Sequence, residues 1–175
     1  PDIFMYTDNR VSEVHFFDRH YKKGYDWYEK NFPLHKNFKY IGESTPKYMC
    51  SEQIMNRIYS YNNNMKLLIF LREPIQRAYS QWNMWCDGYS RNKNPKPLDL
   101  FTSIQTNKSD IISRGKYNEH LQYIFKIFPR KNIHIIISEN LWTNYQSEYN
   151  SLFNFLDIEN ITVGNICSNS SITKN

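Results

Sequence analysis

The stretch Lys66–Leu71 (KLLIFL), followed directly by Arg72-Glu73-Pro74, decides the fold class of this chain. Its apolar run is continuous rather than alternating, which is typical of a strand that is covered on both faces, as in a parallel sheet. Pro74 favours the first turn of a helix, because its fixed φ suits that position. The sequence therefore predicts a buried strand that turns at Arg72 into a helix reaching about Met84 or Trp85.

The same strand pattern recurs in Asn132–Ile137 (NIHIII), and Phe38–Ile41 is a weaker third candidate. Helical patterns lie between and after these strands: Ser51–Tyr61, Leu98–Gln105, Tyr117–Phe128 and Ser147–Leu156. This alternation predicts an α/β fold, a three-layer sandwich around a central, mostly parallel sheet. Ligand sites of such sheets lie at the carboxyl ends of strands, which are Gly42-Glu43, Arg72-Glu73 and Ser138-Glu139 here.

Composition limits the class of protein. The chain has 175 residues, 40% hydrophobic and 17% aromatic, so it matches one domain with a real core and excludes collagen-like and disordered classes. Its apolar runs are too short to span a membrane, and its first residues lack the pattern of a signal peptide. The net charge of +5 favours anionic partners such as nucleotides, acidic glycans or nucleic acid, although ordinary solubilising charge explains it equally well.

The three cysteines, Cys50, Cys86 and Cys167, are widely spaced and form no C-x-x-C motif. The sequence therefore predicts no zinc or redox motif and no metal site. An odd number of cysteines argues against a fully paired disulfide framework, but one pair could still form a bridge.

Two segments carry side chains that suggest chemistry. Arg72 stands where a strand meets a helix N-terminus, a combination that binds anions, with Arg77 as a second candidate. The alternative is that Arg72 pairs with Glu73 or another carboxylate.

Ser12–Asp18 is expected to be extended, with Glu13, His15 and Phe17 on one face. Such a carboxylate and imidazole can share a cleft as proton acceptor and orienting partner. The alternative is a surface Glu and a structural His beside core phenylalanines. The aromatic stretch Tyr21–Phe32 is expected to be core, and secondarily a platform for a ring-bearing ligand.

These segments together resemble the sulfotransferases that use 3′-phosphoadenosine 5′-phosphosulfate (PAPS), especially the heparan sulfate glucosaminyl 3-O- and N-sulfotransferases. The resemblance runs in consistent order from about Glu13 to Leu156. The matching segments are Glu13–Asp18 (EVHFFD), Tyr21–Tyr28 with Phe32-Pro33, Gly42–Tyr48 (GESTPKY), Leu71–Pro74 through Arg77–Ser80, Arg114–Tyr117, Phe128-Pro129 and Ser138–Leu141.

The resemblance implies specific roles. Glu13 would be the general base for an acceptor hydroxyl or amine, with His15 and Asp18 lining the acceptor cleft. Arg72 and Ser80 would hold the 3′-phosphate of PAPS, and Tyr117 would contact the nucleotide. The product nucleotide would be adenosine 3′,5′-bisphosphate, the acceptor a carbohydrate, and no metal is implied.

The sequence also departs from the family pattern. The loop that cradles the 5′-phosphosulfate is not found, nor is a C-terminal segment that closes over the cofactor, and the lysine of the EKTPxY turn is Ser44. We therefore expect residues 1–175 to be one sulfotransferase-like domain, incomplete at both ends and lacking its N-terminal strand. Animal relatives act in the Golgi lumen, whereas a microbial or viral relative would be cytoplasmic, so the compartment stays open.

Three functions compete at this point. The favoured one is PAPS-dependent sulfuryl transfer to a glycan-like acceptor. The second is a catalytically inactive relative that binds the nucleotide or an anionic glycan. The third, nucleic-acid binding, rests on charge alone and has no recognition motif to support it.

Overall fold

The structure is a computed structural model of the chain. It describes residues 3–8, 12–33, 36–91, 99–105 and 110–164.

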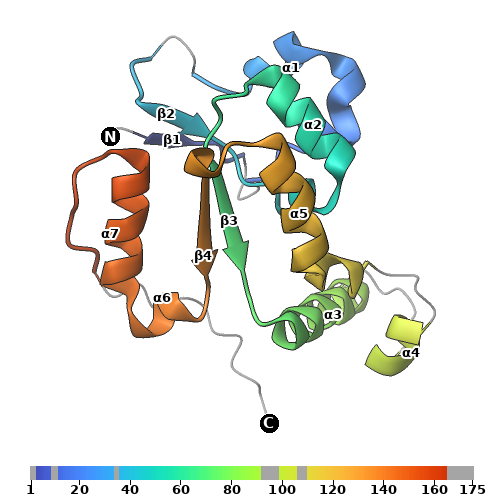
Figure 1. The fold of residues 1–175 in the computed structure, drawn as a ribbon. Helices are drawn as coiled ribbons and strands as arrows, with labels where there is room; N and C mark the ends of the chain where they lie inside the picture. The colour runs from blue at the N-terminus through green and yellow to red at the C-terminus, as the bar shows by residue number, and fades with distance from the viewer. Residues whose placement is uncertain (1–2, 9–11, 34–35, 92–98, 106–109, 165–175) are drawn as a thin grey trace.

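In the described ranges, four short parallel strands form two separate pairs. Strand β1 (Ile3–Met5) pairs with β2 (Tyr40–Gly42), and β3 (Leu67–Leu71) pairs with β4 (Ile133–Ile137) (Figure 1). The predicted α/β class with parallel strands is confirmed, and the three predicted strands lie within two residues of their expected bounds. Among the described residues the backbone hydrogen bonds join strands only within each pair, which the expectation of one central sheet did not anticipate.

The predicted helices are present with small shifts at their ends, and the predicted start of one of them, Leu98, lies outside the described residues. The longer helices are α2 (Glu52–Tyr61), α3 (Pro74–Arg91), α5 (Tyr117–Ile127) and α7 (Tyr145–Leu156), and the shorter ones are α1 (Tyr25–Glu29), α4 (Leu100–Gln105) and α6 (Asn140–Thr143). Helix α2 begins where Ser51 accepts a hydrogen bond from the Ile54 amide, the usual N-cap arrangement. Helix α3 runs beyond its predicted end at Met84 or Trp85.

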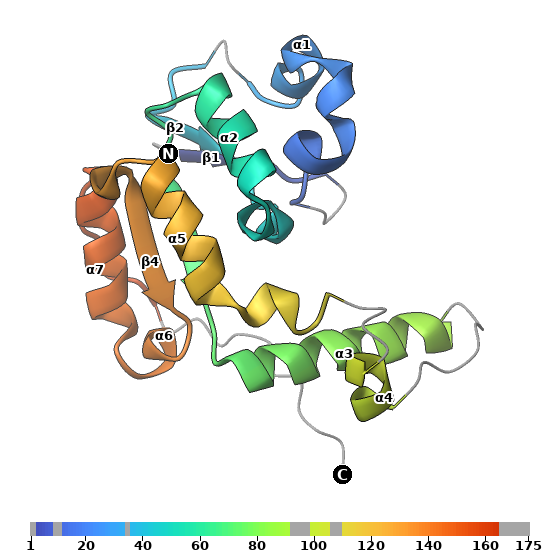
Figure 2. The ribbon, with the colours of Figure 1, turned by 45° about the vertical axis from the view of Figure 1, so that its right-hand side comes forward.

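Helices cover both faces of the β3–β4 pair (Figure 2). On one face Ile69 and Leu71 share a buried core with Ile58 of α2 and Ile124 of α5. On the other face α7 lies over β4, where the Phe155 ring stacks on His134 with 5.1 Å between ring centroids. The layers of the expected sandwich are therefore present around this pair of strands.

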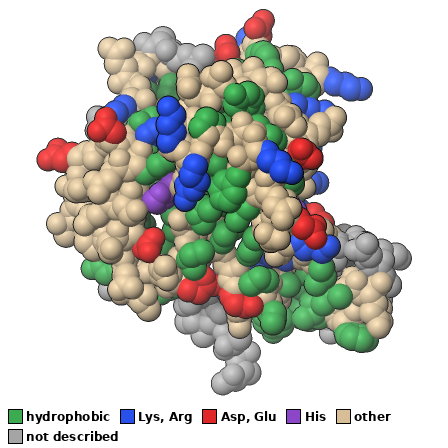
Figure 3. Space-filling model, viewed as in Figure 1, with side chains coloured by type: hydrophobic (Ala, Val, Ile, Leu, Met, Phe, Trp, Pro, Cys, Tyr) green, Lys and Arg blue, Asp and Glu red, His purple; other side chains and the backbone are tan. Residues whose placement is uncertain are grey.

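One part of this second face is open. Leu68 and Phe70 of β3 point to the same face as His134 and Ile136 of β4, because paired residues of parallel strands share a face. Ile136 is buried, whereas Leu68 is 39% exposed and Phe70 54% exposed. Figure 3 shows the hydrophobic side chains gathered over β3 on this side of the molecule. β3 thus presents apolar side chains that the described part of the chain does not cover.

An aromatic layer packs between the first helices and α2. Phe16 and Phe17 are almost completely buried, and the Phe16 ring stacks on Tyr28 with 4.7 Å between centroids. Phe17 packs edge-on against both Tyr28 and Tyr48. The prediction that the aromatic stretch belongs to the core is confirmed for Tyr28, which shares the core cluster with Phe16 and Phe17.

Candidate functional site

The segment that carries Glu13, His15 and Asp18 is not extended, so this prediction is wrong. His15 has φ 54° and ψ 29°, in the left-handed region, and a π-helical turn, η1 (Phe16–His20), begins directly after it. The reason is the burial of two successive phenylalanines, Phe16 and Phe17, which an extended strand would point to opposite faces. The change of direction at His15 brings the three polar side chains together.

His15 lies between two carboxylates. Its Nε2 is 2.8 Å from Oε2 of Glu13, and its Nδ1 is 3.0 Å from Oδ2 of Asp18. The Asp18 side chain is only 6% exposed and that of Glu13 is 39% exposed. With both carboxylates ionised, both contacts are hydrogen bonds only when both ring nitrogens carry protons. The arrangement is a buried acid, a central imidazole and an outer acid that faces solvent.

Behind this array lies Glu43, for which the sequence suggested a place at a strand end but no role. Its Oε1 accepts hydrogen bonds from the hydroxyls of Tyr28 at 2.9 Å and Tyr48 at 3.1 Å. Its Oε2 accepts from the Thr45 hydroxyl at 2.6 Å and from the Val14 amide at 3.2 Å. Burial, and then the neighbouring Glu43 charge, raise the pKa of both tyrosines well above the ordinary value, so both hydroxyls stay protonated donors.

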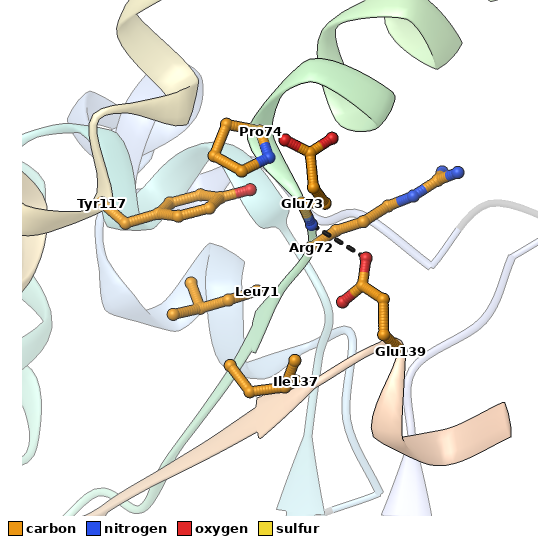
Figure 4. Close-up of a pocket in the computed structure, with 7 residues that line it drawn as sticks. All are labelled: Leu71, Arg72, Glu73, Pro74, Tyr117, Ile137 and Glu139. Carbon is orange, nitrogen blue, oxygen red and sulfur yellow. Dashed lines mark hydrogen bonds between the residues drawn. The ribbon is translucent and has the colours of Figure 1, made fainter. Parts of the chain in front are cut away.

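A second candidate site lies where β3 and β4 end. It is a pocket of about 380 Å³ (Figure 4), and its lining residues are Leu71, Arg72, Glu73, Pro74, Tyr117, Ile137 and Glu139. The sequence rule that places sites at the carboxyl ends of parallel strands identified this position. Arg72 and Tyr117, both predicted nucleotide ligands, are brought together here. The Arg72 guanidinium points away from the apolar floor formed by Leu71 and Ile137 (Figure 4).

Carboxylates occupy much of the polar edge of this pocket. Glu73 Oε1 accepts a hydrogen bond from the Ile75 amide at 3.0 Å, and its Oε2 accepts from the Gln76 amide at 2.6 Å. The Glu73 amide in turn donates to Glu139 Oε1 at 2.8 Å. This amide, and to a smaller extent the Arg72 charge, lower the pKa of the Glu139 carboxyl. The backbone donors predicted to bind a phosphate at the start of α3 are therefore satisfied by the protein itself.

Two further predicted anion ligands do not line this pocket. Arg77 donates to Gln81 Oε1 at 2.7 Å and to the Ile111 carbonyl, so its guanidinium ties α3 to the segment before α5. Ser80 lies on an exposed part of α3 and is not among the lining residues. The alternative that Arg72 forms an ion pair with Glu73 finds no support among the described ion pairs, which do not include Arg72.

The two candidate sites are separate. The lining of the pocket includes none of Glu13, His15 and Asp18. Figures 1 and 2 place the first helical segments and α1 toward one end of the molecule and the start of α3 toward the other.

Cys50 is a half-buried free thiol on the turn before α2, and Cys167 lies outside the described residues. In the described ranges no cluster of His, Cys, Asp and Glu is arranged to hold a metal ion, and none of the helices there has the length and apolarity to cross a membrane.

The chain is similar in sequence to heparan sulfate glucosamine 3-O-sulfotransferases. Heparan sulfate glucosamine 3-O-sulfotransferase 5 of Mus musculus is 31% identical over 154 residues, which are 83% of this chain and 44% of that protein. The 3-O-sulfotransferase 3B1 of Homo sapiens is 28% identical over 161 residues, 86% of this chain and 39% of that protein. The chain thus spans less than half the length of these curated relatives.

A solved structure supports the fold. The crystal structure of a sulfotransferase from Alicyclobacillus acidocaldarius superposes with a TM-score of 0.76 at 19% identity, covering 98% of this chain and 77% of that one. The sulfotransferase-domain family matches residues 2–175. Because this match extends over nearly the whole sequence, the chain belongs to the sulfotransferase domain family.

Proposed function

We propose that the protein containing this chain transfers a sulfuryl group from PAPS to a hydroxyl or amine of a glycan-like acceptor. The observation that carries the proposal is the Glu13–His15–Asp18 array, in a chain that belongs to the sulfotransferase family. An outer carboxylate held by a histidine suits the removal of a proton from an acceptor. Relatives named as heparan sulfate 3-O-sulfotransferases support a carbohydrate acceptor.

The residues at the end of β3 fit one anionic group of the nucleotide. The Arg72 guanidinium can bind a phosphate through two hydrogen bonds, and Tyr117 supplies an aromatic side of the same pocket. Glu73 and Glu139 repel an anion, so we assign the phosphate to the outer edge of the pocket, on Arg72. Because Glu13 does not line this pocket, the nucleotide extends out of it in this proposal and carries its sulfuryl group to an acceptor beside Glu13. PAPS, when bound, supplies the electrophilic sulfuryl group.

The residues around Glu13 handle the proton. Glu13 contacts His15 through Oε2, which leaves Oε1 to take the proton from the acceptor hydroxyl or amine as that atom attacks. Asp18 holds the other ring nitrogen, so the imidazole is fixed in orientation and supports the charge on Glu13. A positioned base of this kind contributes about 10²–10⁴-fold to the rate.

The test is transfer of labelled sulfate from PAPS to a panel of glycans by the full-length protein, comparing wild type with Glu13→Gln. We expect kcat to fall by about 10²–10⁴-fold in the variant, because the amide cannot accept the proton. Binding of adenosine 3′,5′-bisphosphate should be unchanged, since Glu13 does not line the nucleotide pocket.

Equal activity of wild type and Glu13→Gln would overturn the assignment of the base. Binding of the nucleotide without any turnover by wild type would instead select the second candidate, an inactive relative that binds nucleotide or glycan. The observation that favours this second candidate is the pair of carboxylates beside Arg72, Glu73 and Glu139, which oppose the binding of an anion in the pocket.

A further inference from the structure

We infer that Glu43 is a positioning residue that fixes the backbone on which Glu13, His15 and Asp18 stand. The inference rests on the proposed function for its kinetic part, but its structural part can be tested without any activity. Glu43 belongs to β2's carboxyl end and touches neither Glu13 nor Asp18 in the described contacts, so it would act through its neighbours.

Glu43 and its hydrogen-bond donors hold three backbone amides of the Glu13–Asp18 segment. The Val14 amide donates directly to Glu43 Oε2. The His15 amide donates to Thr45 Oγ1 at 3.5 Å, and the Thr45 hydroxyl donates to the same carboxylate oxygen. The Phe17 amide donates to the Tyr48 hydroxyl at 3.4 Å, which in turn donates to Glu43. One carboxylate thus organises the amides on both sides of His15.

These hydrogen bonds are needed because His15 has an unfavourable backbone conformation. For a residue with a Cβ the left-handed region is sterically unfavourable, and it persists only where the surroundings fix it. The ring nitrogens of His15 meet both acids only in this conformation, because an extended His15 would point away from one of them. The hydrogen bonds to Glu43, Thr45 and Tyr48 supply the constraint.

The donors around position 43 need a carboxylate there, and not merely a polar group. Four donors converge on Glu43: three hydroxyls and one amide. A glutamine side chain offers one acceptor oxygen and brings two donors of its own, so it cannot accept from both pairs of donors. Glu43→Gln therefore keeps the size of the side chain and removes part of the support for the segment.

The experiment compares Glu43→Gln and Thr45→Val with a matched control, Glu29→Gln, in the full-length protein. Glu29 accepts a hydrogen bond from Tyr61 at 3.2 Å in the same aromatic layer but binds no amide of the Glu13–Asp18 segment. Thr45→Val removes the hydroxyl that links His15 to Glu43 with little change of volume.

Two readouts separate positioning from general stability. In the transferase assay, Glu43→Gln and Thr45→Val should lower kcat by about 10- to 100-fold with little change in KM, because a displaced base still permits binding. By NMR, the two carbon-bound ring proton resonances of His15, assigned by their loss in His15→Asn, should shift in both variants. Glu29→Gln should retain wild-type kcat and both resonances even where its melting temperature falls equally.

The outcomes distinguish this inference from the proposed function. Wild-type kcat and unchanged His15 resonances in Glu43→Gln would overturn the inference and leave sulfuryl transfer intact. An inactive wild-type protein whose His15 resonances depend on Glu43 would support the inference and refute the function. A fall in kcat equal in Glu29→Gln and Glu43→Gln would show that Glu43 contributes only general stability, and would also overturn the inference.

Discussion

The array around His15 and the pocket around Arg72 differ in how completely the chain builds them. In the first, each ring nitrogen of His15 has a carboxylate partner, and Glu43 ties the backbone behind it. In the second, Arg72 extends from an exposed turn, and its neighbours Glu73 and Glu139 bind backbone amides rather than leaving them for a ligand.

The two sites therefore differ in which contacts fix the positions of their side chains. The acid–histidine array is held by hydrogen bonds between residues 13–18 and 43–48, so the protein's own contacts set its geometry. The pocket offers shape and one guanidinium, and its charge balance is mixed. Changes at the first site should therefore affect rate and backbone stability, and changes at the second should affect nucleotide affinity.

The largest effect on affinity is expected for Arg72→Ala. Loss of a charge-assisted contact to a phosphate should raise the Kd for adenosine 3′,5′-bisphosphate by about 10- to 100-fold in calorimetry with the full-length protein. Lys126→Ala removes the same charge from an exposed position of α5 and serves as the control. An unchanged Kd for Arg72→Ala would exclude Arg72 as a phosphate ligand.

The next effect concerns the strained backbone at His15. Both His15→Gly and His15→Ala remove the ring, but glycine adopts φ 54° without a steric cost, so His15→Gly should be more stable by about 1–2 kcal/mol in urea unfolding. At exposed Gln122 of α5 the same pair of substitutions should show the reverse order. If alanine is as stable as glycine at position 15, the left-handed conformation is not constrained in solution.

A smaller effect is expected for Glu73→Ser. Serine can still cap α3, but it removes a negative charge from the pocket, so adenosine 3′,5′-bisphosphate should bind about two- to fivefold more tightly. Glu52→Ser makes the same change at the start of α2 and should leave the Kd unaltered. Weaker nucleotide binding by Glu73→Ser would mean that Glu73 organises the pocket rather than opposing the ligand.

The smallest expected effect is on the unfolding free energy and concerns Asp110, which is hydrogen-bonded to α3. Asp110 accepts hydrogen bonds from Arg114 at 2.7 Å and from Gln81 of α3 at 3.1 Å. Burial acts to raise the pKa of Asp110, but the bond to Arg114 and its charge outweigh burial and lower it. Because the pair is partly exposed, it contributes about 0.5 kcal/mol or less.

This contribution should be present above the ordinary Asp pKa of about 4 and should be lost as the pH falls through the lowered value. Wild type and Asp110→Asn should therefore differ slightly in unfolding free energy at pH 7 and converge in acid. A difference that grows on acidification would contradict the assignment.

The long elements could be predicted from the sequence, because each carries its own pattern. The apolar runs of β3 and β4 and the buried stripe Ile54, Met55 and Ile58 of α2 are local signals. Strand β1 has only three residues, too few for periodicity to reveal.

The candidate site could be predicted only in its residue types. Alternation in Ser12–Asp18 suggested an extended strand, but that reading put the apolar Phe17 on the same face as Glu13 and His15, and this conflict was a signal of the turn. The sequence placed Glu43 at a strand end but gave no signal of its role, because its donors come from Val14, Tyr28 and Tyr48 as well as the nearby Thr45. Such convergence depends on tertiary packing.

The open side of β3 has a practical consequence for handling the protein. In the described part of the chain β3 is hydrogen-bonded on one edge only, so its other edge offers unpaired backbone groups next to Leu68 and Phe70. Two copies of the described part of the chain could therefore pair through this edge of β3. Self-association would increase with protein concentration. Light scattering should therefore accompany each titration, so that self-association is not mistaken for ligand binding.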